Sequence, residues 1–140
     1  MIIFADTSFF IAFYDGNDQN HEESVSISKK LSSSNPEIVT SDYIYDESIT
    51  YLLLTHPYYG YLRAQKFDID IIGSKKFNFV FVNDYIFHEA RNLFKKYNKD
   101  KKWSFTDCTS FVLMDDYNIS EVLTFDKNFR QKGFKPINFN

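Results

Sequence analysis

Apolar residues in this chain form short runs that stop at polar residues, and these runs alternate with longer stretches where apolar residues recur every three or four positions. The short runs predict buried strands, and the longer stretches predict helices that pack through one face. Strands are predicted at residues 1–5, 38–41, 77–82, 121–125 and 136–139. Helices are predicted at residues 7–14, 20–31, 42–55, 58–72, 84–97 and 104–117.

This alternation predicts an α/β fold with a central parallel sheet of about five strands, covered by helices on both faces. The 140 residues are the size of one ordinary domain and contain no repeat or long linker, so a single domain over residues 1–140 is expected. The 19% aromatic share supplies enough bulk for a sizeable core. The sequence shows neither a signal peptide nor an apolar stretch of the roughly 18 residues that a membrane helix needs. A cytoplasmic protein with no membrane partner is therefore expected.

Acidic residues stand where the predicted strands end. Asp6 ends the first strand, and Asp126 follows the strand at 121–125. Asp107 lies in the first turn of a helix whose Ser104 and Asp107 resemble a capping box. Each acid alone could simply cap a helix or turn, but ligands of open α/β sheets bind outside the carboxyl ends of the strands. Their shared position at one edge of the sheet therefore indicates a binding site.

Glu47 is a fourth candidate, inside the predicted helix at 42–55. A helical wheel places it within the apolar stripe, between Tyr43, Ile44 and Tyr51, and favours it over the adjacent Asp46 as the inward-pointing acid. A carboxylate buried there needs a positive partner, either a distant lysine or a metal ion.

Four carboxylates at one edge suit hard divalent cations such as Mg²⁺ or Mn²⁺, which prefer oxygen ligands and keep several waters. A cation of this kind turns bound water into a better nucleophile and stabilises charge on a phosphoryl group. Other chemistries fare worse, since the three histidines lack zinc spacing and no glycine-rich phosphate loop occurs. Cys108 is expected to pack in the core, and Trp103 is a candidate for stacking on a base.

The net charge of −3 neither proves nor excludes a nucleic-acid partner, because its distribution matters more than its sum. Lysines crowd into residues 94–103 and recur in residues 126–135. Lys127, Arg130 and Lys132 flank Asp126 and are the candidates for contacts with backbone phosphates.

Four segments resemble the motifs of PIN domains, in the family's order and over nearly the whole chain. They are IIFADTSFFIA, TSDYIYDESITYLL, WSFTDCTSFVLM and EVLTFDKNFRQKGF. Within the family the chain is most similar to VapC-like toxins of prokaryotic toxin–antitoxin pairs. The resemblance implies a Rossmann-like three-layer sandwich and an acidic quartet, here Asp6, Glu47, Asp107 and Asp126.

The same resemblance implies an endoribonuclease that depends on Mg²⁺ or Mn²⁺, with Thr7 and Thr106 near the metal ions. It also implies a homodimer and an antitoxin partner; exposed rings in residues 57–61 could supply an apolar patch for dimerisation. The alternatives are a housekeeping RNA-processing nuclease without an antitoxin, a PIN domain that binds RNA without cutting it, and a metal-dependent phosphatase or DNA nuclease.

Overall fold

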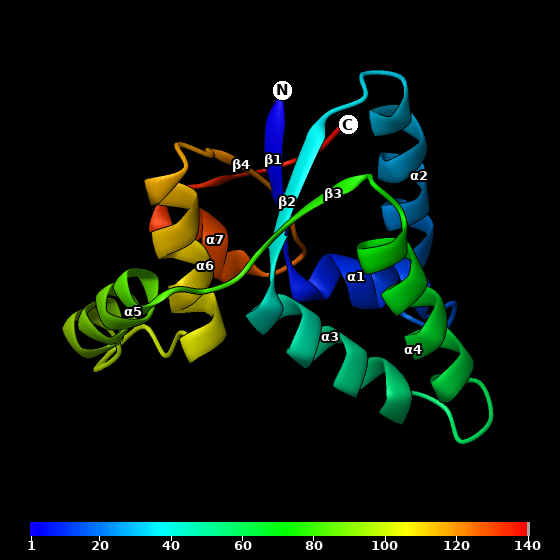
Figure 1. Ribbon diagram of the computed structural model, residues 1–140, viewed down its shortest axis with the longest axis horizontal. Helices are drawn as coiled ribbons and strands as arrows, with labels where there is room; N and C mark the ends of the chain where they lie inside the picture. The colour runs from blue at the N-terminus through cyan, green and yellow to red at the C-terminus, as the bar shows by residue number, and fades with distance from the viewer. Residues whose placement is uncertain (140) are drawn as a thin grey trace.

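The computed structural model describes residues 1–139, which form a five-stranded sheet with helices on both faces (Figure 1). The strands are β1 (Ile2–Ala5), β2 (Glu37–Ser41), β3 (Phe77–Val80), β4 (Glu121–Leu123) and β5 (Lys135–Pro136). Their order is β3-β2-β1-β4-β5, and every neighbouring pair is parallel. The predicted α/β class and the parallel sheet are confirmed.

The helices divide into two groups on either side of the sheet. The first half of the chain contributes α1 (Thr7–Tyr14), α2 (His21–Ser32), α3 (Asp42–Leu54) and α4 (Gly60–Asp68), which continues into the π-helical turn η1 (Ile69–Gly73). The second half contributes α5 (Asp84–Tyr97), α6 (Phe105–Asp116) and α7 (Lys127–Lys132). In Figure 1, α1, α2 and α4 lie on one side of the strands, and α5, α6 and α7 lie on the other.

The core is built largely from rings, as the composition predicts. Phe4, Phe67, Phe111 and Phe129 are fully buried. The Phe111 ring packs edge-on against Phe129, with the ring centroids 4.9 Å apart, and against Trp103, with the centroids 5.1 Å apart. Among residues 1–139, no helix is long and apolar enough to cross a membrane.

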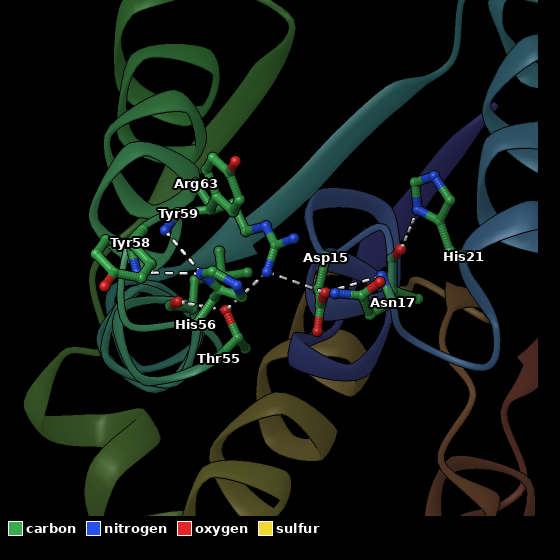
Figure 2. A network of polar contacts seen from close by, with 10 residues as sticks. Asp15, Asn17, His21, Thr55, His56, Tyr58, Tyr59 and Arg63 are labelled. Carbon is green, nitrogen blue, oxygen red and sulfur yellow. Dashed lines mark hydrogen bonds and ion pairs between the residues drawn. The ribbon is translucent and has the colours of Figure 1, made fainter.

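The predicted helix at residues 58–72 is shorter and less regular than expected. His56 Nδ1 accepts hydrogen bonds from the backbone amides of Tyr58 and Tyr59, both at 3.1 Å, so this segment forms a turn before α4 begins (Figure 2). At the other end, the last turn widens into η1. A Cβ atom on Gly60 would collide with the carbonyl oxygen of Leu53, so this close approach of α4 to α3 requires glycine.

An ion pair fastens the hairpin of α3 and α4 to the end of α1. Figure 2 shows Arg63 between Asp15 and Thr55. Its Nη1 lies 3.2 Å from Asp15 Oδ1 and 3.4 Å from Thr55 Oγ1, and the Arg63 and Asp15 side chains are mostly buried. Because the pair is mostly buried, salt screens it less than a surface ion pair, and it orients the hairpin against the end of α1.

One helix, α7, was not predicted. Its six residues, KNFRQK, contain a single buried residue, Phe129, which is too few for an apolar period to be visible. Its ends do carry signals, since Asp126 caps its N-terminus and Gly133 ends it in the left-handed region at a φ of 110°.

Candidate active site

The strand order reverses between β1 and β4, and Asp6 lies at that point. From β1 the chain builds β2 and β3 on one side, then returns to place β4 and β5 on the other. The Asp6 amide donates to the Leu123 carbonyl at 3.0 Å, which joins the ends of the two strands. Such a switch point leaves a crevice between the helices that diverge from neighbouring strands, where ligands of doubly wound sheets bind.

Two hydroxyl groups hold the Asp6 carboxylate. Ser8 Oγ donates to Asp6 Oδ2 at 2.8 Å, and Thr124 Oγ1 donates to the same oxygen at 2.9 Å. Each hydroxyl is itself oriented by a backbone amide, since Phe125 N donates to Ser8 Oγ and Asp126 N donates to Thr124 Oγ1, both at 2.9 Å. Both hydroxyl groups donate to Oδ2, so the orientation of the carboxylate is set by residues from both sides of the switch point.

Asp107 is held by the start of its own helix and by α7. Its amide donates to Ser104 Oγ at 3.0 Å, which confirms Ser104 as the cap of α6. Asn128 Nδ2 donates to Asp107 Oδ2 at 3.1 Å. The Asp107 side chain is 7% exposed and Asp6 is 3% exposed, so the two acids share a largely dry environment.

Asp126 caps α7 directly after the segment that follows β4. Its Oδ1 accepts the amide of Asn128 at 2.9 Å. The backbone of Asn128 therefore binds Asp126 while its side chain binds Asp107, and this one residue links two of the predicted acids. The capping roles considered for Asp6 and Asp126 are present as well, because Asp6 also accepts the Ser8 amide at 3.3 Å at the start of α1.

Glu47 is not buried, contrary to the prediction. The buried residues of α3 are Ile44, Ser48 and Leu52, and Glu47 lies on the neighbouring exposed face. The helical wheel correctly placed Glu47 on the same face of the helix as Tyr51, but Tyr51 is itself 58% exposed. Glu47 nevertheless lies close enough to Asp107 for its charge to contribute to raising the pKa of Asp107.

Burial and mutual repulsion raise the pKa values of two of these carboxylates, Asp6 and Asp107. Burial, then the charges of Asp107 and Asp126, raise the pKa of Asp6 from 3.8 to about 7, against the lowering effect of its hydroxyl donors. Burial is also the main cause that raises the pKa of Asp107 to about 6, with Asp126 and Glu47 adding to it. The charges of Asp126 and Glu47 act on these two buried carboxylates, so the acids form one electrostatic cluster that favours a cation.

The donor set fits a hard divalent cation, because it consists of carboxylate oxygens. Within residues 1–139, no three Asp, Glu, His or Cys side chains lie close enough together to form a ready-made metal site. Mg²⁺ usually keeps several waters and is held by one or two carboxylates, so a site for it needs few protein ligands. The hydroxyl of Thr7, beside Asp6, is buried and has no hydrogen-bond partner among the described residues.

The remaining predicted residues lie in different surroundings. Lys127 and Arg130 are exposed on α7, whereas Lys132 Nζ lies 3.4 Å from Asp115 and over the Phe134 ring. Thr106 is half-buried in the first turn of α6.

Trp103 and Cys108, for which functional roles were also considered, both lie in the core. Trp103 is 3% exposed and donates Nε1 to Gln131 at 3.3 Å, so its candidacy for base stacking was wrong. Cys108 is buried, and burial together with the Asp107 charge raises the pKa of its thiol to about 11, which suits packing and not nucleophilic attack.

Ser8, Thr124 and Asn128 also belong to the site, although none of them was a predicted site residue. Ser8 and Thr124 are 116 residues apart in sequence, and their contact exists only through the pairing of β1 with β4. Each of the three stands two residues from a candidate acid and lies inside a segment that resembles a PIN motif. These were the sequence signals that could have found them.

Comparisons with known proteins agree with this architecture. The chain is 27% identical over 130 residues to a VapC ribonuclease of Archaeoglobus fulgidus, covering 92% of this chain and 80% of that protein. It is similar to the crystal structure of the Mycobacterium tuberculosis toxin VapC20, which cleaves the sarcin–ricin loop, with a TM-score of 0.82, 27% identity and 96% of each chain covered.

A more distant solved structure shares the fold. VapBC-1 of nontypeable Haemophilus influenzae matches with a TM-score of 0.62 and 18% identity, covering 99% of this chain and 98% of that one. The family model for the PIN domain matches residues 3–135, and this chain therefore belongs to the PIN domain family.

Proposed function

We propose that this protein is a divalent-metal-dependent endoribonuclease that hydrolyses RNA phosphodiester bonds, and that it is the toxin of a type II toxin–antitoxin pair. The observation that carries this proposal is the cluster of acids at the β1–β4 switch point, two of them buried with raised pKa values. The similarity of this chain to a VapC ribonuclease and to a toxin that cleaves the sarcin–ricin loop supports RNA as the substrate.

Asp6, Glu47, Asp107 and Asp126 would hold the metal, which we infer to be Mg²⁺ or Mn²⁺. Nucleases of this family generally depend on divalent metals. When bound, such an ion lowers the pKa of water and neutralises charge that develops on the phosphate. The chain's own contribution is orientation, because the hydroxyls on Asp6 and the Asn128 amide on Asp107 fix two carboxylates before any ligand arrives.

The substrate backbone would meet α7. Lys127 and Arg130 are exposed beside Asp126 and are free to bind phosphates, whereas Lys132 would first have to leave Asp115. If these contacts exist, cleavage weakens steeply as salt rises.

Two protein partners belong to the proposal. An antitoxin is expected because the structural relatives include the toxin–antitoxin assembly VapBC-1. A homodimer is expected because Tyr58, Tyr59 and Tyr61 are 81%, 57% and 61% exposed around the turn before α4. We place the protein in the cytoplasm as one domain over residues 1–140.

Cleavage of total cellular RNA, and of an oligonucleotide containing the sarcin–ricin loop, tests the nuclease. Wild type and Asp107→Asn are compared with Mg²⁺, Mn²⁺ or EDTA, and Asp46→Asn serves as the control because Asp46 is an exposed acid beside Glu47. We expect discrete fragments from the wild type and from Asp46→Asn that EDTA abolishes and that Asp107→Asn does not produce. A folded Asp107→Asn protein that cuts as fast as the wild type would exclude this site.

The same assays separate the alternatives. A protein that binds RNA at all metal concentrations without cutting it is a binding domain. Cleavage of DNA or release of phosphate in preference to cleavage of RNA indicates the phosphatase or DNA nuclease. An active nuclease with no inhibitor encoded in a neighbouring reading frame is a housekeeping enzyme.

A further inference from the structure

Aromatic side chains gather beside the acidic cluster, where α3, α5 and α6 meet. Phe105, the first residue of α6, contacts Phe87 at 5.3 Å and Phe94 at 6.3 Å between ring centroids. On its other side it meets Tyr43 at 6.2 Å. We call Phe87, Phe94 and Phe105, with Tyr43 at their edge, the aromatic shelf.

The shelf adjoins the candidate active site through the two helices that carry Glu47 and Asp107. Phe105 is two residues before Asp107 on α6, and Tyr43 is one helical turn before Glu47 on the same face of α3. Because the charge of Glu47 acts on Asp107, the contact between Tyr43 and Phe105 lies next to the acids and not at a remote surface.

Two rings of the shelf remain accessible. Phe87 is 37% exposed and Phe94 is 41% exposed, although both are large apolar side chains on a helix that packs closely on α6. Arg91 lies between them on the same face of α5, because positions i, i+4 and i+7 follow one stripe of a helix. Its Nη1 is 3.1 Å from His88 Nδ1, which adds a further ring nitrogen to this face.

The segment that carries Phe87 and Phe94 is basic, in contrast to the rest of the chain. Residues 84–102 contain six Lys or Arg against three Asp or Glu, a local charge of +3 in a chain of net charge −3. A second exposed aromatic surface, in residues 51–62, contains no Lys or Arg, so it suits an apolar protein partner. Rings interleaved with cations are what a single-stranded nucleic acid needs, since its bases stack and its phosphates require positive charge.

We propose that the aromatic shelf binds unpaired bases of the RNA next to the cleaved phosphate, while Arg91 binds the backbone between them. The proposal rests on the ribonuclease function above and adds the residues that would hold the unpaired bases of a single-stranded or looped substrate. Bases inside a duplex are already stacked and cannot lie on the rings, so a continuous duplex gains nothing from the shelf.

Binding of labelled RNA to the full chain tests the shelf without relying on cleavage. Fluorescence anisotropy is measured in EDTA with a fluorescein-labelled 12-nucleotide strand of no self-complementarity, and with the same strand annealed to its complement. The variants are Phe87→Leu/Phe94→Leu, Phe94→Leu alone and Arg91→Gln. Tyr85→Leu is the matched control, because Tyr85 is a 59% exposed ring on the same helix but on a different face.

We expect the wild type and Tyr85→Leu to prefer the single strand. The double leucine variant should bind the single strand about tenfold or more weakly, with duplex binding unchanged, because base stacking on one ring is typically worth that much. Arg91→Gln should lower the salt dependence of binding by about one phosphate contact. In cleavage assays the leucine variants should raise KM and leave kcat nearly unchanged.

The shelf is excluded if a folded leucine variant binds the single strand as tightly as the wild type, or if Tyr85→Leu loses as much affinity. Phe94→Leu alone decides the question should the double variant unfold. Normal RNA cleavage by leucine variants with unchanged KM overturns the shelf and leaves the nuclease standing. Absence of cleavage by the wild type overturns the nuclease, and the anisotropy measurement still decides the shelf.

Discussion

Asp6→Asn should stabilise the metal-free protein at alkaline pH while abolishing metal-dependent cleavage. Asn has the same shape, caps helices as well as Asp, and can still accept hydrogen bonds from Ser8 and Thr124. It removes the negative charge that burial and Asp107 make unfavourable. The substitution therefore separates the electrostatic cost of the site from its packing.

The size and sign of the effect follow from the raised pKa. Asp6 has a pKa of about 7 in the folded protein and 3.8 as its ordinary value, so the folded state holds this proton more tightly than the unfolded chain. The associated stability is fully present below about pH 4 and is lost as the pH rises through about 7. At pH 8 the ionised carboxylate then destabilises the metal-free fold by up to about 4 kcal/mol, at 1.36 kcal/mol per pH unit.

Urea unfolding in EDTA at pH 4 and pH 8 measures this difference. We expect Asp6→Asn and the wild type to have similar free energies of unfolding at pH 4, and the variant to be more stable at pH 8. Mg²⁺ at pH 8 should stabilise the wild type and have no effect on the variant. Asp46→Asn, at an exposed acid, is the control. Equal stability of Asp6→Asn and wild type at pH 8 would refute the argument that Asp6 is ionised at a cost.

Three further outcomes are expected. Thr124→Val removes one donor that orients Asp6, and calorimetric titration should show Mg²⁺ affinity about tenfold weaker or more; unchanged affinity would mean that the hydroxyl does not support the site. Gly60→Ala should lower the free energy of unfolding by about 1–3 kcal/mol, because the added Cβ collides with the backbone of Leu53. Gly16→Ala, at a position with open space, should be nearly neutral, and thermal melts of both variants test this. Cys108→Ala should cleave RNA at nearly the wild-type rate, because a buried thiol with a pKa of about 11 is not a nucleophile; loss of more than tenfold with an intact fold would contradict this.

The regular part of the fold was predictable because each element carries its own signal. The run IIFA ends at Asp6, and the strand observed there ends at Ala5. The helix at residues 7–14 was predicted at its observed bounds. Six-residue α7 has no such period, and no pattern in residues 69–73 marks the π-helical turn η1, so neither could be recognised from the chain alone.

The candidate site was only partly predictable, for a related reason. Strand ends pointed to Asp6 and Asp126, because parallel strands share one carboxyl edge. A helical wheel ranks the faces of a helix relative to one another but does not say which face another element covers, so Glu47 was expected to be buried and is exposed. The prediction for Trp103 was wrong in the opposite direction. The lysines beside it suggested an exposed ring, whereas the ring is buried in the core.

The bonds that join Asp6 to Thr124 also set the order in which the site can come into existence during synthesis. Residues 1–8 emerge first, but Asp6 receives its second hydroxyl from a residue 118 positions later in the chain. A nascent chain that stops before β4 therefore has Asp6 without the Thr124 hydroxyl and Asp107 without the Asn128 amide. The proposed site is complete only when residues 121–128 have been made and β4 has paired with the first strand.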